Sequence, residues 1–228
     1  MAEERKTEKR RVRRTPVYTI IVYLYWLIAK LFFFMRFEGL ERVPRGVPCI
    51  LMGNHQCLLD PVTLALCARD REIRFMGKKE LFDKPVLGWL FRAAHGFPVD
   101  RGSLDMSAIR TAMGILAEGE TLGIFPEGTR CHTGHMLPLL GGASMIALRG
   151  RCPVVPVYID GNYRIFRRIV VRVGEPIRMD DLLAGRVNRE SCEELTRRME
   201  ASFAQLSGGK SLPPASSPGQ NPAEEKNS

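Results

Sequence analysis

Residues 54–60 read NHQCLLD and place His55 and Asp60 in one short segment, with four residues between them. A histidine whose second ring nitrogen is held by a carboxylate is fixed in one tautomer and is stabilised as an imidazolium. A general base for an alcohol requires this arrangement. Pro61 follows directly, and proline suits the first position of a helix, so Asp60 is also a candidate N-cap. We predict a catalytic pair, with the N-cap as the alternative.

Two further blocks combine charged side chains with turn residues. In GIFPEGTR, a turn accounts for Pro126 and Gly128 but not for Glu127 and Arg130. A carboxylate that accepts substrate hydroxyls and a guanidinium that binds phosphate would together hold a glycerol phosphate. Arg101, in GFPVDRGS, precedes a helix, where its guanidinium is either solvated or directed at a phosphate.

These blocks lie between short apolar runs that alternate with helical patterns. The runs are PCILMG, IRFMG, GFPVD, TLGIF, CPVVPVYI and RIVVRVG. The alternation predicts an α/β fold, a single domain with a mostly parallel or mixed central sheet flanked by helices. The clearest helices are predicted at 104–118, with Ser103 as cap, and at 190–206. The proline in VVPVYIDG predicts an edge strand or a bulge.

A hydrophobic helix is expected before this domain. Residues 17–35 form an apolar run of 19 residues in which Lys30 is the only charge. That length is close to the ~20 residues needed to span a bilayer. We expect the helix to lie in or re-enter the cytoplasmic leaflet, and a true span is the alternative.

Charge and cysteine usage narrow the class of protein. Of the net charge of +9, residues 1–14 supply seven basic and three acidic groups, or +4. A basic cluster beside an apolar run favours anionic lipid headgroups over nucleic acid. The six cysteines form no CxxC pair, so neither a zinc ribbon nor a disulfide framework is indicated. Reduced thiols in the cytoplasm are the simpler interpretation.

Four segments follow from these patterns. We expect a basic arm at 1–15, a membrane-associated helix at 16–37, a catalytic domain at 38–206 and a disordered tail at 207–228. The tail reads GGKSLPPASSPGQNPAEEKNS from residue 208, and its Pro, Gly, Ser and charge content cannot build a core.

Together, the three polar blocks resemble the glycerolipid acyltransferase family, which includes the 1-acylglycerol-3-phosphate acyltransferases. The resemblance rests on Asn54, His55 and Asp60, on GFPVDR with Arg101, and on FPEGTR at 125–130, followed by VVPV. It covers residues from about 45 to 180. It implies that the domain at 38–206 is an acyltransferase domain.

The resemblance also implies an activity. The enzyme would transfer an acyl chain from acyl-CoA or acyl-carrier protein to the free hydroxyl of 1-acylglycerol 3-phosphate, giving phosphatidic acid for phospholipid biosynthesis at the cytoplasmic face of the cell membrane. His55 would be the general base and Asp60 its orienting acid, with no metal or other cofactor. The implied substrate-binding residues are Arg101, Glu127, Gly128, Thr129 and Arg130.

Two departures from the family pattern keep alternatives open. Family members commonly have serine or threonine where this chain has Cys57, so an acyl-enzyme on that thiol is a rival mechanism. They also have a basic residue where this chain has Leu140, so Lys78 or Lys79 would compensate, or the acceptor is a different lysophospholipid. A hydrolase and a non-enzymatic, membrane-tethered lipid-binding protein are the remaining alternatives.

Overall fold

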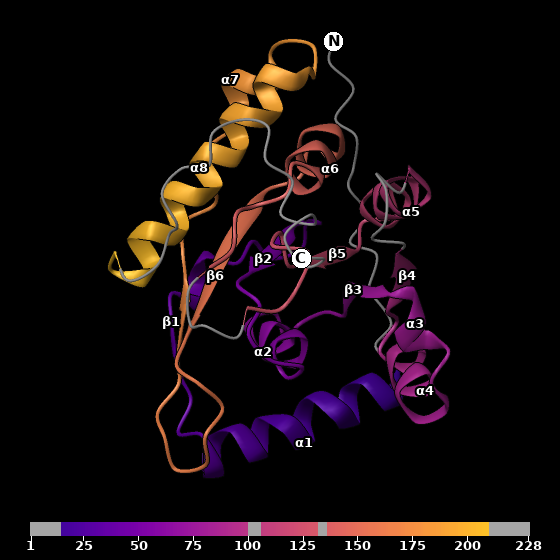
Figure 1. Cartoon of the computed structure of the whole chain (residues 1–228), viewed down its shortest axis with the longest axis vertical. Coiled ribbons are helices and arrows are strands. Elements are labelled where there is room, and N and C mark those ends of the chain that lie inside the picture. The colour runs from indigo at the N-terminus through magenta and orange to yellow at the C-terminus, as the bar shows by residue number, and fades with distance from the viewer. Residues whose placement is uncertain (1–14, 100–105, 132–135, 210–228) are drawn as a thin grey trace, which may run out of the picture.

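A computed structural model describes residues 15–99, 106–131 and 136–209. Within these residues, one sheet has the strand order β1-β7-β6-β2-β5-β3-β4 (Figure 1). All neighbouring strands are parallel except β6 and β7, which are antiparallel. The strands are β1 (Arg36–Glu38), β2 (Ile50–Gly53), β3 (Ile73–Lys78), β4 (Phe97–Val99), β5 (Thr121–Ile124), β6 (Val154–Asp160) and β7 (Val170–Val173). The α/β fold with a mostly parallel sheet is confirmed.

Helices cover both faces of the sheet. One face packs against α1 (Pro16–Phe32) and α2 (Asp60–Cys67). The other face packs against α5 (Met106–Ala117), α6 (Gly142–Gly150) and α8 (Arg189–Ser207). The shorter helices are η1 (Leu40–Arg42), α3 (Lys79–Phe82), α4 (Pro85–Ala93) and α7 (Asp180–Leu183). The helices predicted at 104–118 and 190–206 correspond to α5 and α8, and Ser103 lies outside the described residues.

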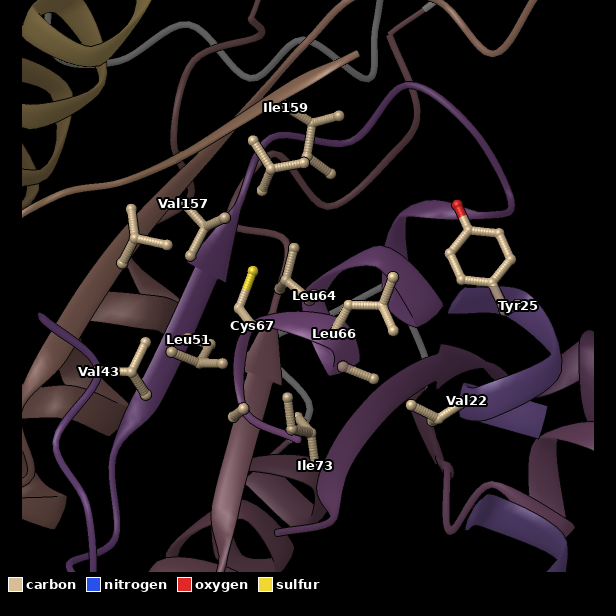
Figure 2. Packing of buried hydrophobic residues seen from close by; sticks show 14 of the residues in the cluster. Val22, Tyr25, Val43, Leu51, Leu64, Leu66, Cys67, Ile73, Val157 and Ile159 are labelled. Atoms are coloured by element: carbon tan, nitrogen blue, oxygen red, sulfur yellow. The ribbon is translucent and has the colours of Figure 1, made fainter. Parts of the chain in front are cut away.

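The central strands are buried on both faces, which explains their continuous apolar sequence. In β2, Leu51 faces α1 and α2, whereas Ile50 and Met52 face the opposite layer. On the first side, Leu51 and Ile159 of the sheet share a core with Leu64 of α2 (Figure 2). Because both sides are packed, the ends of β2 are fixed in position, and so are the loops that leave them.

Helix α1 is apolar on two sides. Its buried residues, Tyr18, Val22, Tyr25 and Ala29, recur at helical spacing and join the core shared with α2. Most of its remaining large apolar side chains are exposed: Val17, Ile20, Tyr23, Leu24, Leu27, Ile28, Leu31 and Phe32. Ile21 and Trp26 are half-buried. The helix is shorter than the predicted 16–37, because it ends at Phe32 and β1 begins at Arg36. Nowhere in the described ranges is a helix both long and apolar enough to cross a bilayer.

The proline of β6 was predicted to mark an edge strand or a bulge, and this prediction was wrong, because β6 is interior and its register with β2 is continuous. Pro156 lies in an interior strand, between β2 and β7. Its carbonyl accepts a hydrogen bond from the Gly174 amide, and the β6–β7 pairing starts only at Val157, opposite Val173. Gly174 lies opposite Pro156, one residue beyond the end of β7, so the missing N–H removes a hydrogen bond only at the end of this ladder.

Three adjacent strands run in the same direction, in the order β6, β2, β5. Their carboxyl ends therefore lie at one edge of the sheet, where open α/β sheets bind ligands. The loops that follow these strands carry residues 54–59, 125–131 and 161–169.

Candidate active site

His55 and Asp60 meet in the loop between β2 and α2. The Nδ1 atom of His55 lies 2.9 Å from Oδ2 of Asp60. The Asp60 side chain is fully buried, whereas 12% of the His55 side chain is exposed. Because the carboxylate accepts the proton of Nδ1, the Nε2 atom of His55 is the nitrogen left for a substrate.

The carboxylate of Asp60 turns back into its own loop. Its Oδ2 atom accepts hydrogen bonds from the backbone N–H groups of Gln56 and Cys57, both at 2.6 Å. Its Oδ1 atom accepts one from the Tyr163 hydroxyl at 2.7 Å. Asp60 is the first residue of α2, and the N-cap position is occupied by Leu59. The N-cap alternative is therefore wrong, because the carboxylate is committed to the loop and to His55.

Contacts with neighbouring loops hold the His55 backbone and ring. The Phe125 ring stacks on the imidazole, with 4.2 Å between ring centroids. The Cys131 amide donates to the His55 carbonyl at 2.8 Å, which joins the loops after β2 and β5. The buried Asn54 side chain bonds both backbone groups of Ile159, accepting from its N–H at 2.7 Å and donating to its carbonyl at 3.1 Å. The histidine is thus positioned by all three central strands.

Glu127 contacts the loop that carries His55. Its Oε1 atom accepts a hydrogen bond from the His55 amide at 2.7 Å, and its Oε2 atom accepts one from the Leu137 amide at 2.8 Å. Burial raises the pKa of Glu127 to about 7, against the opposing effect of these two donors. Its role as an acceptor of substrate hydroxyls stays a prediction, and the structure adds a second role: the side chain ties residues 55 and 137 together.

Gly128, Thr129 and Arg130, also predicted to bind substrate, follow Glu127 in the loop after β5. Gly128 has a φ of +68°, in the left-handed region that favours glycine. Thr129 and Arg130 are exposed, and the Arg130 guanidinium has no ion pair with any described residue. Arg101 lies outside the described residues. Leu140 is half-exposed, and a Cβ atom at Gly128 would lie 2.5 Å from its side chain.

Cys57 contributes its backbone to the site. Its amide holds Asp60, and no hydrogen bond connects its sulfur to His55 among the residues that the structure describes. Lys78, considered above as a substitute for a basic residue at 140, forms an ion pair with Glu80 at 3.0 Å.

A chain of hydroxyl groups lies behind Asp60 and was not predicted from the sequence. The Tyr163 hydroxyl, which donates to Asp60, is 3.0 Å from the Thr63 hydroxyl, which in turn is 2.7 Å from the Tyr25 hydroxyl. Burial and the nearby Asp60 charge raise the pKa of Tyr163 well above 10.0, so this phenol remains a donor. Tyr163 could have been identified from its place just after β6, at the same sheet edge as His55.

Comparisons with known proteins identify a family and several relatives that this chain resembles. A sequence profile described as "Acyltransferase" matches residues 34–160. The chain is 35% identical over 146 residues to the 1-acyl-sn-glycerol-3-phosphate acyltransferase of Bacillus subtilis, covering 62% of this chain and 72% of that protein. It is 28% identical over 194 residues to the enzyme of the same name from Streptococcus pneumoniae, covering 82% of this chain and 70% of that one.

The fold is also similar to that of a solved structure. The crystal structure of the 1-acyl-sn-glycerophosphate (LPA) acyltransferase PlsC from Thermotoga maritima aligns with a TM-score of 0.64 at 24% identity, over 86% of this chain and 79% of that one. Since the matching profile covers more than half of the chain and includes the His55–Asp60 loop and the Glu127 loop, the protein belongs to the acyltransferase family.

Proposed function

We propose that the protein transfers an acyl chain from a thioester donor, acyl-CoA or acyl-carrier protein, to the free hydroxyl of 1-acylglycerol 3-phosphate, giving phosphatidic acid. The observation that carries the proposal is the 2.9 Å contact between His55 Nδ1 and Asp60, in a loop where the imidazole keeps its Nε2 atom for a substrate. The names of the bacterial relatives support the choice of acceptor.

The chemistry needs only the residues of this loop. Nε2 of His55 takes the proton of the acceptor hydroxyl as its oxygen attacks the thioester carbonyl. The tetrahedral intermediate then collapses, the C–S bond breaks, and the departing thiolate receives the proton from the imidazolium. Asp60 compensates the charge of the imidazolium throughout. General base catalysis of this kind contributes about 10² to 10⁴ in rate.

The loop after β5 is proposed to hold the acceptor. Arg130 is exposed, and the next residue in the chain is bonded to the His55 carbonyl. A guanidinium at this place can pair with the phosphate while the acceptor hydroxyl reaches Nε2. Glu127, Gly128, Thr129 and Arg101 complete the proposed substrate-binding set.

Membrane association is the second part of the proposal. A continuous exposed face of large apolar residues on α1 is more than a monomeric water-soluble surface usually carries. We place this face in the cytoplasmic leaflet of the cell membrane, because both the acyl chain and the lysophospholipid reside there. The basic residues of segment 1–15 would add attraction to anionic headgroups.

One observation favours a different lysophospholipid as the acceptor. Leu140, where family members commonly carry a basic residue, lies against Gly128 and is half-exposed. One cation fewer at the phosphate would reduce discrimination between 1-acylglycerol 3-phosphate and lysophospholipids with a larger headgroup.

The test uses the purified full chain in detergent with acyl-CoA and a panel of lysophospholipids. Thiol release and the lipid product are both measured. His55→Ala is expected to lower transfer by about 10² to 10⁴, the range for a lost general base. The control is His95→Asn, because His95 lies beside β4 with a φ of +55° that asparagine tolerates. If no lysophospholipid supports thiol release by the wild-type protein, the proposal is wrong. Release with free fatty acid as the only product would instead show a hydrolase.

A further inference from the structure

The connection between β6 and β7 carries exposed apolar and basic residues together. Residues 161–169 read GNYRIFRRI, with three arginines and no acidic residue. Ile165 and Phe166 are 61% and 69% exposed. Arg164, Arg167 and Arg168 are exposed too, and none of them has an ion-pair partner among the described residues. We call residues 164–168 the hairpin tip.

The hairpin tip is attached to the end of α1 (Figure 1). The Phe166 amide donates to the Phe32 carbonyl at 2.7 Å, and the Ile169 amide donates to the Phe33 carbonyl at 3.2 Å. The Phe166 ring lies 6.4 Å from the rings of both Phe32 and Phe34. These contacts make the tip continuous with the exposed apolar face of α1.

Phe166 is held outward by an unusual backbone. Its φ is +61°, a region that residues other than glycine seldom adopt, and Phe34 beside it has a φ of +41°. Such conformations persist only where surrounding contacts fix them, and they concentrate at functional positions. Here the result is a cluster of three exposed aromatic rings, those of Phe32, Phe34 and Phe166.

We propose that the hairpin tip is a second bilayer contact, in which Ile165 and Phe166 enter the interface of an anionic membrane and the three arginines pair with lipid phosphates. The proposal rests on the proposed membrane contact of α1 and adds a partner surface to it. Exposed aromatic and aliphatic residues flanked by unpaired cations are the composition of interfacial membrane-binding segments.

The base of the same hairpin reaches the catalytic pair. Tyr163 donates to Asp60 and packs its ring edge against Phe33, with 5.7 Å between centroids. The bilayer contact is thus one residue away, along the chain, from the group that holds the catalytic acid. Docking of the tip would set the height of His55 above the membrane surface at the same time as it steadies Tyr163.

An acidic carrier protein is the other partner that three arginines could attract. The bilayer is favoured because the centre of the tip is Ile165 and Phe166, and because the tip continues the apolar face of α1. An acidic carrier protein would bind mainly to the arginines, whereas a bilayer would contact both the arginines and the apolar side chains.

The test compares binding of the full chain to zwitterionic vesicles and to vesicles that contain anionic phospholipid. The charge variant combines Arg164→Gln, Arg167→Gln and Arg168→Gln. Its matched control removes three exposed arginines from α5, α6 and the segment after α7 by the changes Arg110→Gln, Arg149→Gln and Arg186→Gln. Each arginine near an anionic surface strengthens binding about five-fold, so the charge variant should bind anionic vesicles about 100-fold more weakly. The control should change this affinity by less than about five-fold, the contribution of one arginine at the surface.

A second pair of variants tests the apolar contribution. Ile165→Asn should weaken binding to both kinds of vesicle, and Val47→Asn, at an exposed position before β2, should not. Unchanged thermal midpoints show that each variant is folded. Equal losses in the charge variant and its control would overturn the proposal, since net charge alone would then explain binding. Normal vesicle binding by the charge variant, with transfer lost only from acyl-carrier protein, would identify the tip as a carrier-protein site instead.

These outcomes are separate from the proposed chemistry. Acyl transfer by the wild-type chain to lysophospholipid dispersed in detergent tests the reaction without any vesicle. Transfer in detergent together with vesicle binding that is insensitive to Arg164, Arg167, Arg168 and Ile165 would reject the hairpin contact and keep the proposed reaction.

Discussion

Replacing Tyr163 by phenylalanine removes one hydroxyl group and retains the ring that packs on Phe33. The hydroxyl is the donor to Oδ1 of Asp60, at 2.7 Å, while Oδ2 is shared by His55 and two backbone amides. In the Tyr163→Phe variant, Oδ1 keeps no donor among the described residues. The carboxylate is then free to rotate, and rotation breaks its alignment with Nδ1 of His55.

The size of the effect follows from the type of hydrogen bond. A hydrogen bond to a charged group contributes about 1.5–3 kcal/mol. The free energy of unfolding should therefore fall by about 1.5–3 kcal/mol, because Asp60 is fully buried and water cannot replace the donor. The lower bound corresponds to about ten-fold in rate, and we expect kcat to fall by about this factor. The KM for the acceptor should stay the same, since Tyr163 contacts Asp60 and Thr63 rather than the loop after β5, which is proposed to hold the acceptor.

The assay measures thiol release in detergent over a range of acceptor concentrations, together with denaturant unfolding. Tyr25→Phe is the matched control. It removes a hydroxyl from the same chain of groups, but this hydroxyl contacts Thr63 and not Asp60. We expect Tyr25→Phe to lower the free energy of unfolding by about 1 kcal/mol and to leave kcat within about two-fold of the wild type.

Two results would refute the reasoning. A Tyr163→Phe protein with wild-type kcat would show that the two backbone amides alone hold Asp60 in position. Equal losses of kcat in Tyr163→Phe and Tyr25→Phe would show that the hydroxyls act through packing between α1 and the hairpin, and not through the carboxylate.

The remaining predictions concern Glu127 and Cys57. Burial raises the pKa of Glu127 from 4.5 to about 7 in the folded protein. The unfolded chain therefore loses this proton at a lower pH than the folded protein does. As a result, the free energy of unfolding falls as the pH rises from 4.5 to 7. Relative to Glu127→Gln, which does not titrate, the wild-type free energy of unfolding should fall by roughly 3 kcal/mol over that window. Denaturant unfolding of both proteins at each pH measures this difference. If the free energies of unfolding of the two proteins change equally with pH, the prediction is wrong. Cys57→Ser should keep its transfer activity, because serine retains the backbone amide that bonds Asp60. Loss of both activity and trapped acyl chain would instead support an acyl-enzyme on the thiol.

The predictable part of the site is the part made by residues close in sequence. The Asp60 carboxylate reaches His55 within one tight loop, so the spacing of the two residues in the sequence was enough to predict that they meet. The same is true of the apolar strands and of helices α5 and α8, whose periodicity is local. A chain that alternates such elements has few alternatives to an α/β sheet.

The parts that escaped prediction depend on contacts between distant segments. Glu127 accepts hydrogen bonds from residues 55 and 137, and nothing in the FPEGTR block specifies those donors. Tyr163 lies 103 residues from Asp60 in the chain. Pro156 occurs in an interior strand because β7 happens to end beside it, which only the register of two strands determines. The sequence of α1 likewise showed its apolar character but not which side faces the core.

The position of β2 between β5 and β6 has a consequence for how the protein is made. Residues 55, 127 and 163 come from the first, second and last thirds of the sheet-forming chain, in the loops after β2, β5 and β6, yet they meet at one candidate active site. A nascent chain that has not yet emerged as far as Tyr163 contains His55 and Asp60 but lacks the strand and the hydroxyl that secure them. We therefore expect the site to be completed late in synthesis, after β6 pairs with β2 and Tyr163 reaches Asp60.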